Sequence, residues 1–240
     1  MKVLGEEGNA AYYNNAILLT GLTGIVTMLP CLYFYRKDRR ARVAGGLIRT
    51  EKPRNLSLGE CGLILLMGAG FAQFANMFVS MIGSFLKAEE YQETMSQMTD
   101  GKSMFFLIIC MGVIAPIAEE IVFRWLIYLR LRDYMRAGTA MVISGVFFGV
   151  YHGNLVQGVY ASILGILFAY LLELTGSLWT SVLLHMGANI WSLVLPELVN
   201  WILIKYPAAI MLLLIALLTG ICAGTVYFRK YAEENEGRIV

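Results

Sequence analysis

The sequence predicts an all-α fold, a polytopic bundle of about seven transmembrane helices. Of the 240 residues, 58% are hydrophobic and only 15% are charged, with a mean hydropathy of +0.64. A soluble domain carries about 25% charged residues. The apolar residues fall into seven segments, most of them near the roughly 20 residues that cross a bilayer. With no linker or internal repeat, residues 1–240 are expected to form a single membrane domain.

Composition argues against several other classes. The net charge is +2, and no basic run interleaved with aromatic residues lies away from the apolar segments, so no nucleic-acid partner is indicated. The four cysteines form no CxxC pair, which argues against a disulfide framework and a thiolate zinc site. The first apolar segment lacks a basic flank and a clear cleavage site, so it is not expected to be a signal peptide. The first expected partner is the lipid bilayer.

The first two expected spans set the orientation. Ala16–Tyr35 is followed directly by the basic run Arg36–Arg42. By the positive-inside rule this run is cytoplasmic and serves as a topology anchor, which places the N-terminus outside. The second span, Leu58–Leu86, is rich in glycine, and its polar residues Gln73 and Asn76 are expected to face other helices.

The rest of the chain continues the alternation. The acidic loop Lys87–Lys102 fits the outside and is expected to carry a short amphipathic helix. The third span, Met104–Val122, continues toward a group of arginines at the cytoplasmic surface, and Gly138 is expected to end its helix. Seven spans place the C-terminus in the cytoplasm, in agreement with its charged tail. The last four expected spans are Ala140–Tyr151, Val156–Leu174, Leu178–Leu195 and Ala208–Phe228. Pro196 is expected to end the span Leu178–Leu195.

Two adjacent carboxylates and an arginine stand at the end of the third span. Glu120 and Arg124 share a helix face, with the acid before the base, the favoured order for an ion pair. Glu119 lies about 100° around the helix and has no partner on its own face. One charge inside a span costs roughly 2.5–3.5 kcal/mol. The Glu120–Arg124 pair therefore either supports a site or only locks the helix to its neighbours. Pro116 is expected to leave the carbonyl of Gly112 without its helical donor.

The only two histidines also lie in expected spans. His152 follows Phe148 by one helical turn, and His185 precedes Asn189 by one turn on the same face. Ionisable residues inside a membrane are functional candidates by default. Counting about 1.5 Å per residue from the expected turns, both histidines can reach the depth of Glu119.

This set of groups suits the activation of water. Glu119 would take a proton from a water molecule that His152 helps to hold, and the water would attack a carbonyl carbon. His185 and Asn189 would donate hydrogen bonds to the developing oxyanion, each worth about 3 kcal/mol. Alternatively, Glu119, His152 and His185 are zinc ligands, because two histidines and one glutamate form a known catalytic zinc set. No H-E-x-x-H motif supports the zinc alternative.

Three short motifs carry a resemblance to a known family. EEIVFR has the form EExxxR, FGVYH the form FxxxH and HMGAN the form HxxxN. In this order, on successive membrane helices, they resemble the motifs of the CPBP family, the CaaX proteases and bacteriocin-processing enzymes also called the Abi family. The motifs cover Ala115 to about Asn189, within a catalytic core expected at about residues 104–195.

The resemblance implies an intramembrane endopeptidase that hydrolyses a peptide bond of a membrane-associated peptide or protein. It makes Glu119 the water-activating base, His152 its partner on the water, and His185 with Asn189 the oxyanion site. The family was long labelled as metalloproteases, but its CaaX members look like glutamate-dependent enzymes without metal. No cofactor is therefore expected, with zinc as the alternative. The implied catalytic residues are Glu119, Glu120, Arg124, His152, His185 and Asn189.

The resemblance leaves the biological role open. Many bacterial members are linked to bacteriocin maturation or self-immunity, and this short chain looks bacterial, so a plasma-membrane location is expected and a CaaX substrate is not assumed. The alternative from another class is a non-catalytic immunity protein or a proton- or cation-coupled transport protein, because buried carboxylates and histidines also serve ion pathways. Asn189 discriminates between the two, since an oxyanion site needs a neutral donor and a proton relay does not.

Overall fold

The computed structural model describes residues 5–46, 55–83 and 88–235, and within these ranges every regular element is a helix. Six helices are long and apolar enough to cross a membrane, and α7 is a shorter apolar helix. The expected all-α bundle of about seven spans is therefore confirmed. The helices are α1 (Gly5–Ala44), α2 (Leu58–Met81), α3 (Ala88–Thr99), α4 (Met104–Leu107), α5 (Ala115–Glu120), α6 (Leu129–Arg132), α7 (Ala137–Tyr151), α8 (Leu155–Thr175), α9 (Leu178–Leu198) and α10 (Pro207–Glu234).

Three π-helical stretches lie within two of the membrane helices. The stretches η2 (Ile108–Ile114) and η3 (Ile121–Tyr128) flank α5, so that α4 to α6 form one continuous helix. The third, η4 (Val199–Leu203), extends α9. A π turn inserts one extra residue and is found frequently at functional sites.

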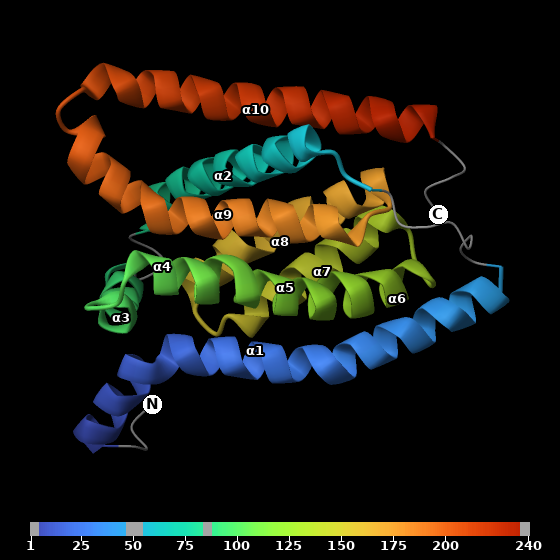
Figure 1. Cartoon of the computed structure of the whole chain (residues 1–240), viewed down its shortest axis with the longest axis horizontal. Helices are drawn as coiled ribbons and strands as arrows, with labels where there is room; N and C mark the ends of the chain where they lie inside the picture. The colour runs from blue at the N-terminus through green and yellow to red at the C-terminus, as the bar shows by residue number, and fades with distance from the viewer. Residues whose placement is uncertain (1–4, 47–54, 84–87, 236–240) are drawn as a thin grey trace.

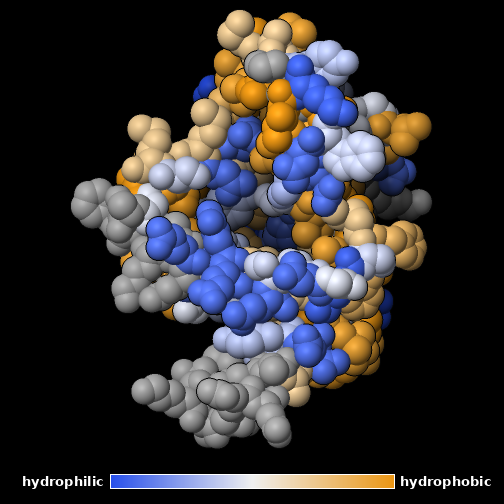
Figure 2. Space-filling model, turned by 90° about the vertical axis from the view of Figure 1, so that its left-hand side faces the viewer, coloured by the Kyte–Doolittle hydropathy of each residue, from blue (hydrophilic) through white to orange (hydrophobic). Residues whose placement is uncertain are grey.

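The long helices lie side by side, with α1 and α10 on opposite sides of the bundle (Figure 1). Helix α3 crosses one end, where the expected short helix in the acidic loop is thus found. Figure 2 looks at this end and shows hydrophilic side chains across much of it. The exposed polar residues of α3 include Gln92, Glu93, Ser96 and Gln97.

Small residues let the inner helices approach closely. A Cβ atom on Gly68 of α2 would overlap the carbonyl oxygen of Leu184 on α9, so only glycine fits there. Small residues serve the same purpose in other membrane helix pairs. The polar residues of α2 follow the expectation in part: the Gln73 carbonyl accepts a hydrogen bond from the Trp191 indole at 2.9 Å, and Asn76 is half-buried.

Two expected helix ends are wrong. The third membrane helix ends at Arg132, and Gly138 lies inside the first turn of α7, because glycine keeps its backbone N–H and costs a helix only about 1 kcal/mol relative to alanine. Helix α9 also continues through Pro196. The π turn that follows takes up the change of register, and neighbouring helices commonly make proline tolerable within membrane helices.

Ion pairs tie the helices together at the opposite end from α3, which we call the basic end. Arg42 of α1 binds Asp133 at 2.8 Å, and Arg130 of α6 binds Asp38 at 2.6 Å. On the other side of the same helix, Arg132 binds Glu173 of α8 at 2.8 Å. These pairs fix the C-terminal end of the helix that carries the two central glutamates.

We expect Glu173→Gln to lower the free energy of unfolding by about 1 kcal/mol, since it removes a half-buried charge-assisted contact. Tyr128 also donates a hydrogen bond to Glu173. The glutamine side chain can still accept this bond, which becomes weaker because the acceptor is no longer charged. Thermal unfolding in detergent measures the change. The matched control is Glu234→Gln, whose exposed pair with Lys230 should contribute nothing measurable. An equal shift for both variants would contradict this assignment.

Candidate active site

The site begins with a local break in helical hydrogen bonding. In η2 the Ala115 N–H donates to the carbonyl of Cys110, five residues back, instead of to Met111. In this register the donor for the Met111 carbonyl would be residue 116, which is proline and has no N–H. The Met111 carbonyl is therefore left without a backbone donor, next to the Gly112 carbonyl, whose α-helical donor would be the same proline. The sequence alone gave no sign of the π register.

Asn189 of α9 supplies the missing donor. Its side-chain Nδ2 donates a hydrogen bond of 2.8 Å to the Met111 carbonyl. The HxxxN motif thus reaches across to the proline turn that precedes the two glutamates. An asparagine amide carries two N–H donors, so this bond uses one of them and leaves the second.

Asn189→Ala should destabilise the protein by about 1–3 kcal/mol, because it orphans a carbonyl whose backbone donor is already missing. Thermal unfolding in detergent would show this loss. The matched control is Ser181→Ala on the same helix, whose hydroxyl donates to the Leu178 carbonyl of its own helix. If the two variants melted together, the Asn189–Met111 bond would carry no special weight.

The Glu120–Arg124 pair is fully buried. The Arg124 Nε lies 3.3 Å from Glu120 Oε2, and both side chains have no exposed surface. Within the described part of the chain, the guanidinium nitrogens of Arg124 make no hydrogen bond. The pairing that the sequence spacing predicts is therefore present, in a fully dehydrated setting.

His185 stands between the two glutamates. Its Nδ1 lies 3.1 Å from Glu120 Oε1, and its Nε2 lies 3.6 Å from Glu119 Oε2. An ionised carboxylate only accepts hydrogen bonds, so Nδ1 carries a proton that points at Glu120. Glu119 is the less buried of the two acids, with 14% of its side chain exposed. Arg124, Glu120, His185 and Glu119 thus form a chain that begins at the fully buried Arg124 and ends at the partly exposed Glu119.

Two phenylalanine rings enclose this chain. The Arg124 guanidinium lies 4.6 Å from the Phe148 ring centre and 5.2 Å from that of Phe168. Phe168 also stacks on His185, with centroids 4.7 Å apart and an angle of 25°. Phe148 belongs to the FxxxH motif. Phe168 was missed by sequence reasoning, because an apolar residue in an apolar span carries no signal of its own.

His152 lies beside this chain and not within it. Its Nδ1 is 2.7 Å from the Phe148 carbonyl, which only accepts, so Nδ1 is the donor. The Phe148 ring packs against both histidines, with 4.8 Å between the ring centres of Phe148 and His152 and 5.4 Å between those of Phe148 and His185. No ion pair between His152 and either glutamate is found among the described residues.

The zinc alternative finds no support in this arrangement. The described residues hold no group of three histidine, cysteine or acidic side chains placed to bind a metal ion. The two ring nitrogens of His185 face Glu119 and Glu120, which both belong to α5. They do not point, together with His152, at a common position for a metal ion.

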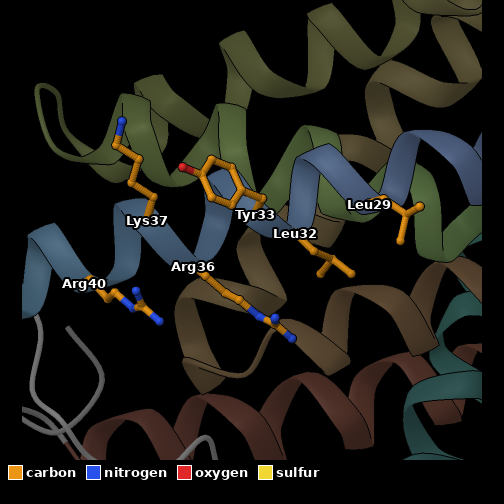
Figure 3. A pocket seen from close by; sticks show the side chains of 6 residues that line it. All are labelled: Leu29, Leu32, Tyr33, Arg36, Lys37 and Arg40. Carbon is orange, nitrogen blue, oxygen red and sulfur yellow. The ribbon is translucent and has the colours of Figure 1, made fainter.

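A surface groove lies elsewhere, along α1 (Figure 3). None of the candidate site residues lines it. The groove is lined by side chains from the C-terminal half of α1, namely Leu29, Leu32, Tyr33, Arg36, Lys37 and Arg40.

The fold and the site together define a polytopic membrane protein with an acid–histidine chain buried inside its helix bundle. Residues 101–191 match the family model described as type II CAAX prenyl endopeptidase Rce1-like. The chain is also 26% identical over 192 residues to the Bacillus subtilis (strain 168) protein named "Putative membrane peptidase YdiL", covering 77% of this chain and 75% of that protein. These matches to membrane peptidases confirm the resemblance to the CPBP family. No solved structure matches the chain.

Proposed function

We propose that this protein is an intramembrane endopeptidase that hydrolyses a peptide bond with a water molecule activated by Glu119. The observation that carries the proposal is the position of His185, with one ring nitrogen facing each of the two glutamates. An ion pair that only locked helices would need no histidine between the acids. The order Arg124–Glu120–His185–Glu119 instead resembles the base–orienter arrangement by which active sites hold a proton-transfer group.

In this mechanism Glu119 removes a proton from water while the oxygen attacks the carbonyl carbon of the substrate. In the resting site the Nε2–H of His185 faces the Glu119 carboxylate, with 3.6 Å between Nε2 and Oε2. Once Glu119 is protonated, this N–H is free to donate to the oxyanion of the tetrahedral intermediate. The intermediate then collapses, and Glu119 passes its proton to the leaving amine. The products are a new carboxylate and a new amine, and Glu119 is ionised again.

The other residues hold this arrangement in place. Glu120 accepts the Nδ1–H of His185 on one oxygen and fixes the ring, and Arg124 holds the other oxygen of Glu120. We assign the second amide N–H of Asn189 to the oxyanion, beside its bond to the Met111 carbonyl. His152, whose Nδ1 is occupied by the Phe148 carbonyl, offers the lone pair of Nε2 to the attacking water.

The proposed substrate is a peptide or protein associated with the membrane. The site lies within a helix bundle with many exposed apolar side chains, which suits a substrate that is itself held in the bilayer beside the bundle. The basic end, with Arg36–Arg42 and the arginines of α6, is placed in the cytoplasm by the positive-inside rule, together with the C-terminal end of α10. The N-terminal end of α1 and helix α3 then lie outside.

A quenched-fluorescent peptide library tests the proposal, with detergent-purified protein in the presence and absence of a strong chelator. Cleavage that survives the chelator and is lost in Glu119→Gln supports the water activated by glutamate. Cleavage that the chelator abolishes and zinc restores overturns the metal-free mechanism. Cleavage that Glu119→Gln retains shows that another group is the base.

A further inference from the structure

We propose that Gly165 and Phe168 of α8 are positioning residues of this active site. They lie outside all three motifs, on a helix that contributes no charged group to the site. Gly165 leaves the space that the Arg124 guanidinium occupies, and Phe168 holds the His185 ring by stacking. The proposal rests on the function proposed above, because the residues act through Arg124 and His185.

Gly165 faces the charged end of Arg124. A Cβ atom at this position would lie 2.8 Å from Arg124 Nη2 and 3.1 Å from the Phe148 ring. The same Cβ atom would lie 3.1 Å from the Gly145 Cα of α7. The contact at 2.8 Å is closer than packed atoms accept and the two at 3.1 Å are tight, so alanine must displace the guanidinium and shift the Phe148 ring and α7 by a few tenths of an ångström. Displacing the guanidinium alters the 3.3 Å pair with Glu120, whose other oxygen receives His185.

Phe168 contacts two members of the chain of buried groups, His185 and Arg124. Its ring is fully buried, stacks on His185 and lies 5.2 Å from the Arg124 guanidinium. The electron-rich face of an aromatic ring attracts a cation, and the attraction is strongest when both groups are dehydrated. Arg124 makes no hydrogen bond within the described residues, so Phe168 and Phe148 supply contacts that would otherwise be missing.

The geometry of His185 depends on the same ring. The short Nδ1 contact with Glu120 sets the direction of the imidazole but leaves rotation about that contact open. A stacked ring on one side removes this freedom and keeps Nε2 aimed at Glu119. Removing the stack should therefore impair the orientation of His185 before it impairs the fold.

Two matched controls separate this role from ordinary packing. Gly145→Ala disturbs the contact between α7 and α8, since its Cβ would lie 2.6 Å from Ile166 and 2.9 Å from the Ser162 carbonyl, but it does not meet Arg124. Phe228→Leu removes an equally buried phenylalanine, on α10. Both controls are expected to lower stability without altering His185.

The test combines kinetics with histidine NMR. The chain has only two histidines, so protein labelled with ¹⁵N-histidine in detergent gives two sets of ring signals, assigned with His152→Gln. Phe168→Leu and Gly165→Ala should move the His185 ring signals and lower kcat about tenfold or more, with KM little changed. Phe228→Leu and Gly145→Ala should leave both readouts near those of the unmodified protein.

Unmoved His185 signals in Phe168→Leu and Gly165→Ala, or kinetics equal to those of the controls, would overturn the positioning role. The NMR readout does not depend on catalysis. If Glu119→Gln kept full cleavage while the His185 signals moved as expected, the proposed function would fail and the contact of α8 with the chain of groups would stand.

Discussion

Glu119→Gln should reduce peptide cleavage by a factor of about 10²–10⁴, because it removes the general base from the proposed mechanism. Glutamine keeps the length and shape of the side chain, and it replaces an acid that is partly exposed and makes no hydrogen bond among the described residues. The fold should therefore be unaffected, with an unchanged melting temperature in detergent. The measurement is kcat/KM on the best peptide of the library.

The matched control is Glu93→Gln on α3, which removes an exposed carboxylate from the polar end of the bundle. It should cleave as fast as the unmodified protein. Full activity in Glu119→Gln would move the base to another group, with Glu120 as the first candidate. Loss of activity in both variants would point to a general effect of charge and not to a specific base.

Part of this site could be predicted because it depends on helical spacing. Residues four apart on a helix share a face, so the Glu120–Arg124 pair followed from the sequence alone, and the structure contains it. The proximity of His185 to the glutamates required helices from distant parts of the chain. Only a rough comparison of depth could suggest it, yet the histidine does lie beside both acids.

Other parts depend on register and packing, which spacing does not determine. A proline predicts a freed carbonyl four residues back, at Gly112, but it does not predict that the π turn also frees the Met111 carbonyl, which accepts a hydrogen bond from Asn189. Gly165 and Phe168 look like any other apolar positions of a membrane helix, and their importance arises only from the side chains that α8 meets. The expected helix end at Pro196 was wrong because neighbouring helices tolerate a proline that an isolated helix does not.

Glu120→Gln should destabilise the protein by about 3–5 kcal/mol, because it leaves the fully buried guanidinium of Arg124 without its carboxylate. At about 2–4 °C per kcal/mol for a chain of this size, the melting temperature should fall by roughly 6–20 °C. Cleavage should be lost as well, since His185 loses the acceptor of its Nδ1–H. This variant alone therefore cannot distinguish a structural pair from a catalytic one.

The double variant Glu120→Gln/Arg124→Met makes that distinction. Replacing both members of a buried ion pair by neutral groups is often neutral or stabilising, so most of the lost stability should return. If the pair also fixes the His185 ring, cleavage should stay at least about tenfold below that of the unmodified protein although the fold has recovered. Recovery of cleavage together with stability would show that the pair only locks the helix, and that His185 finds its orientation without Glu120. The role of the EExxxR motif is thus decided by whether activity follows stability when the charges are removed together.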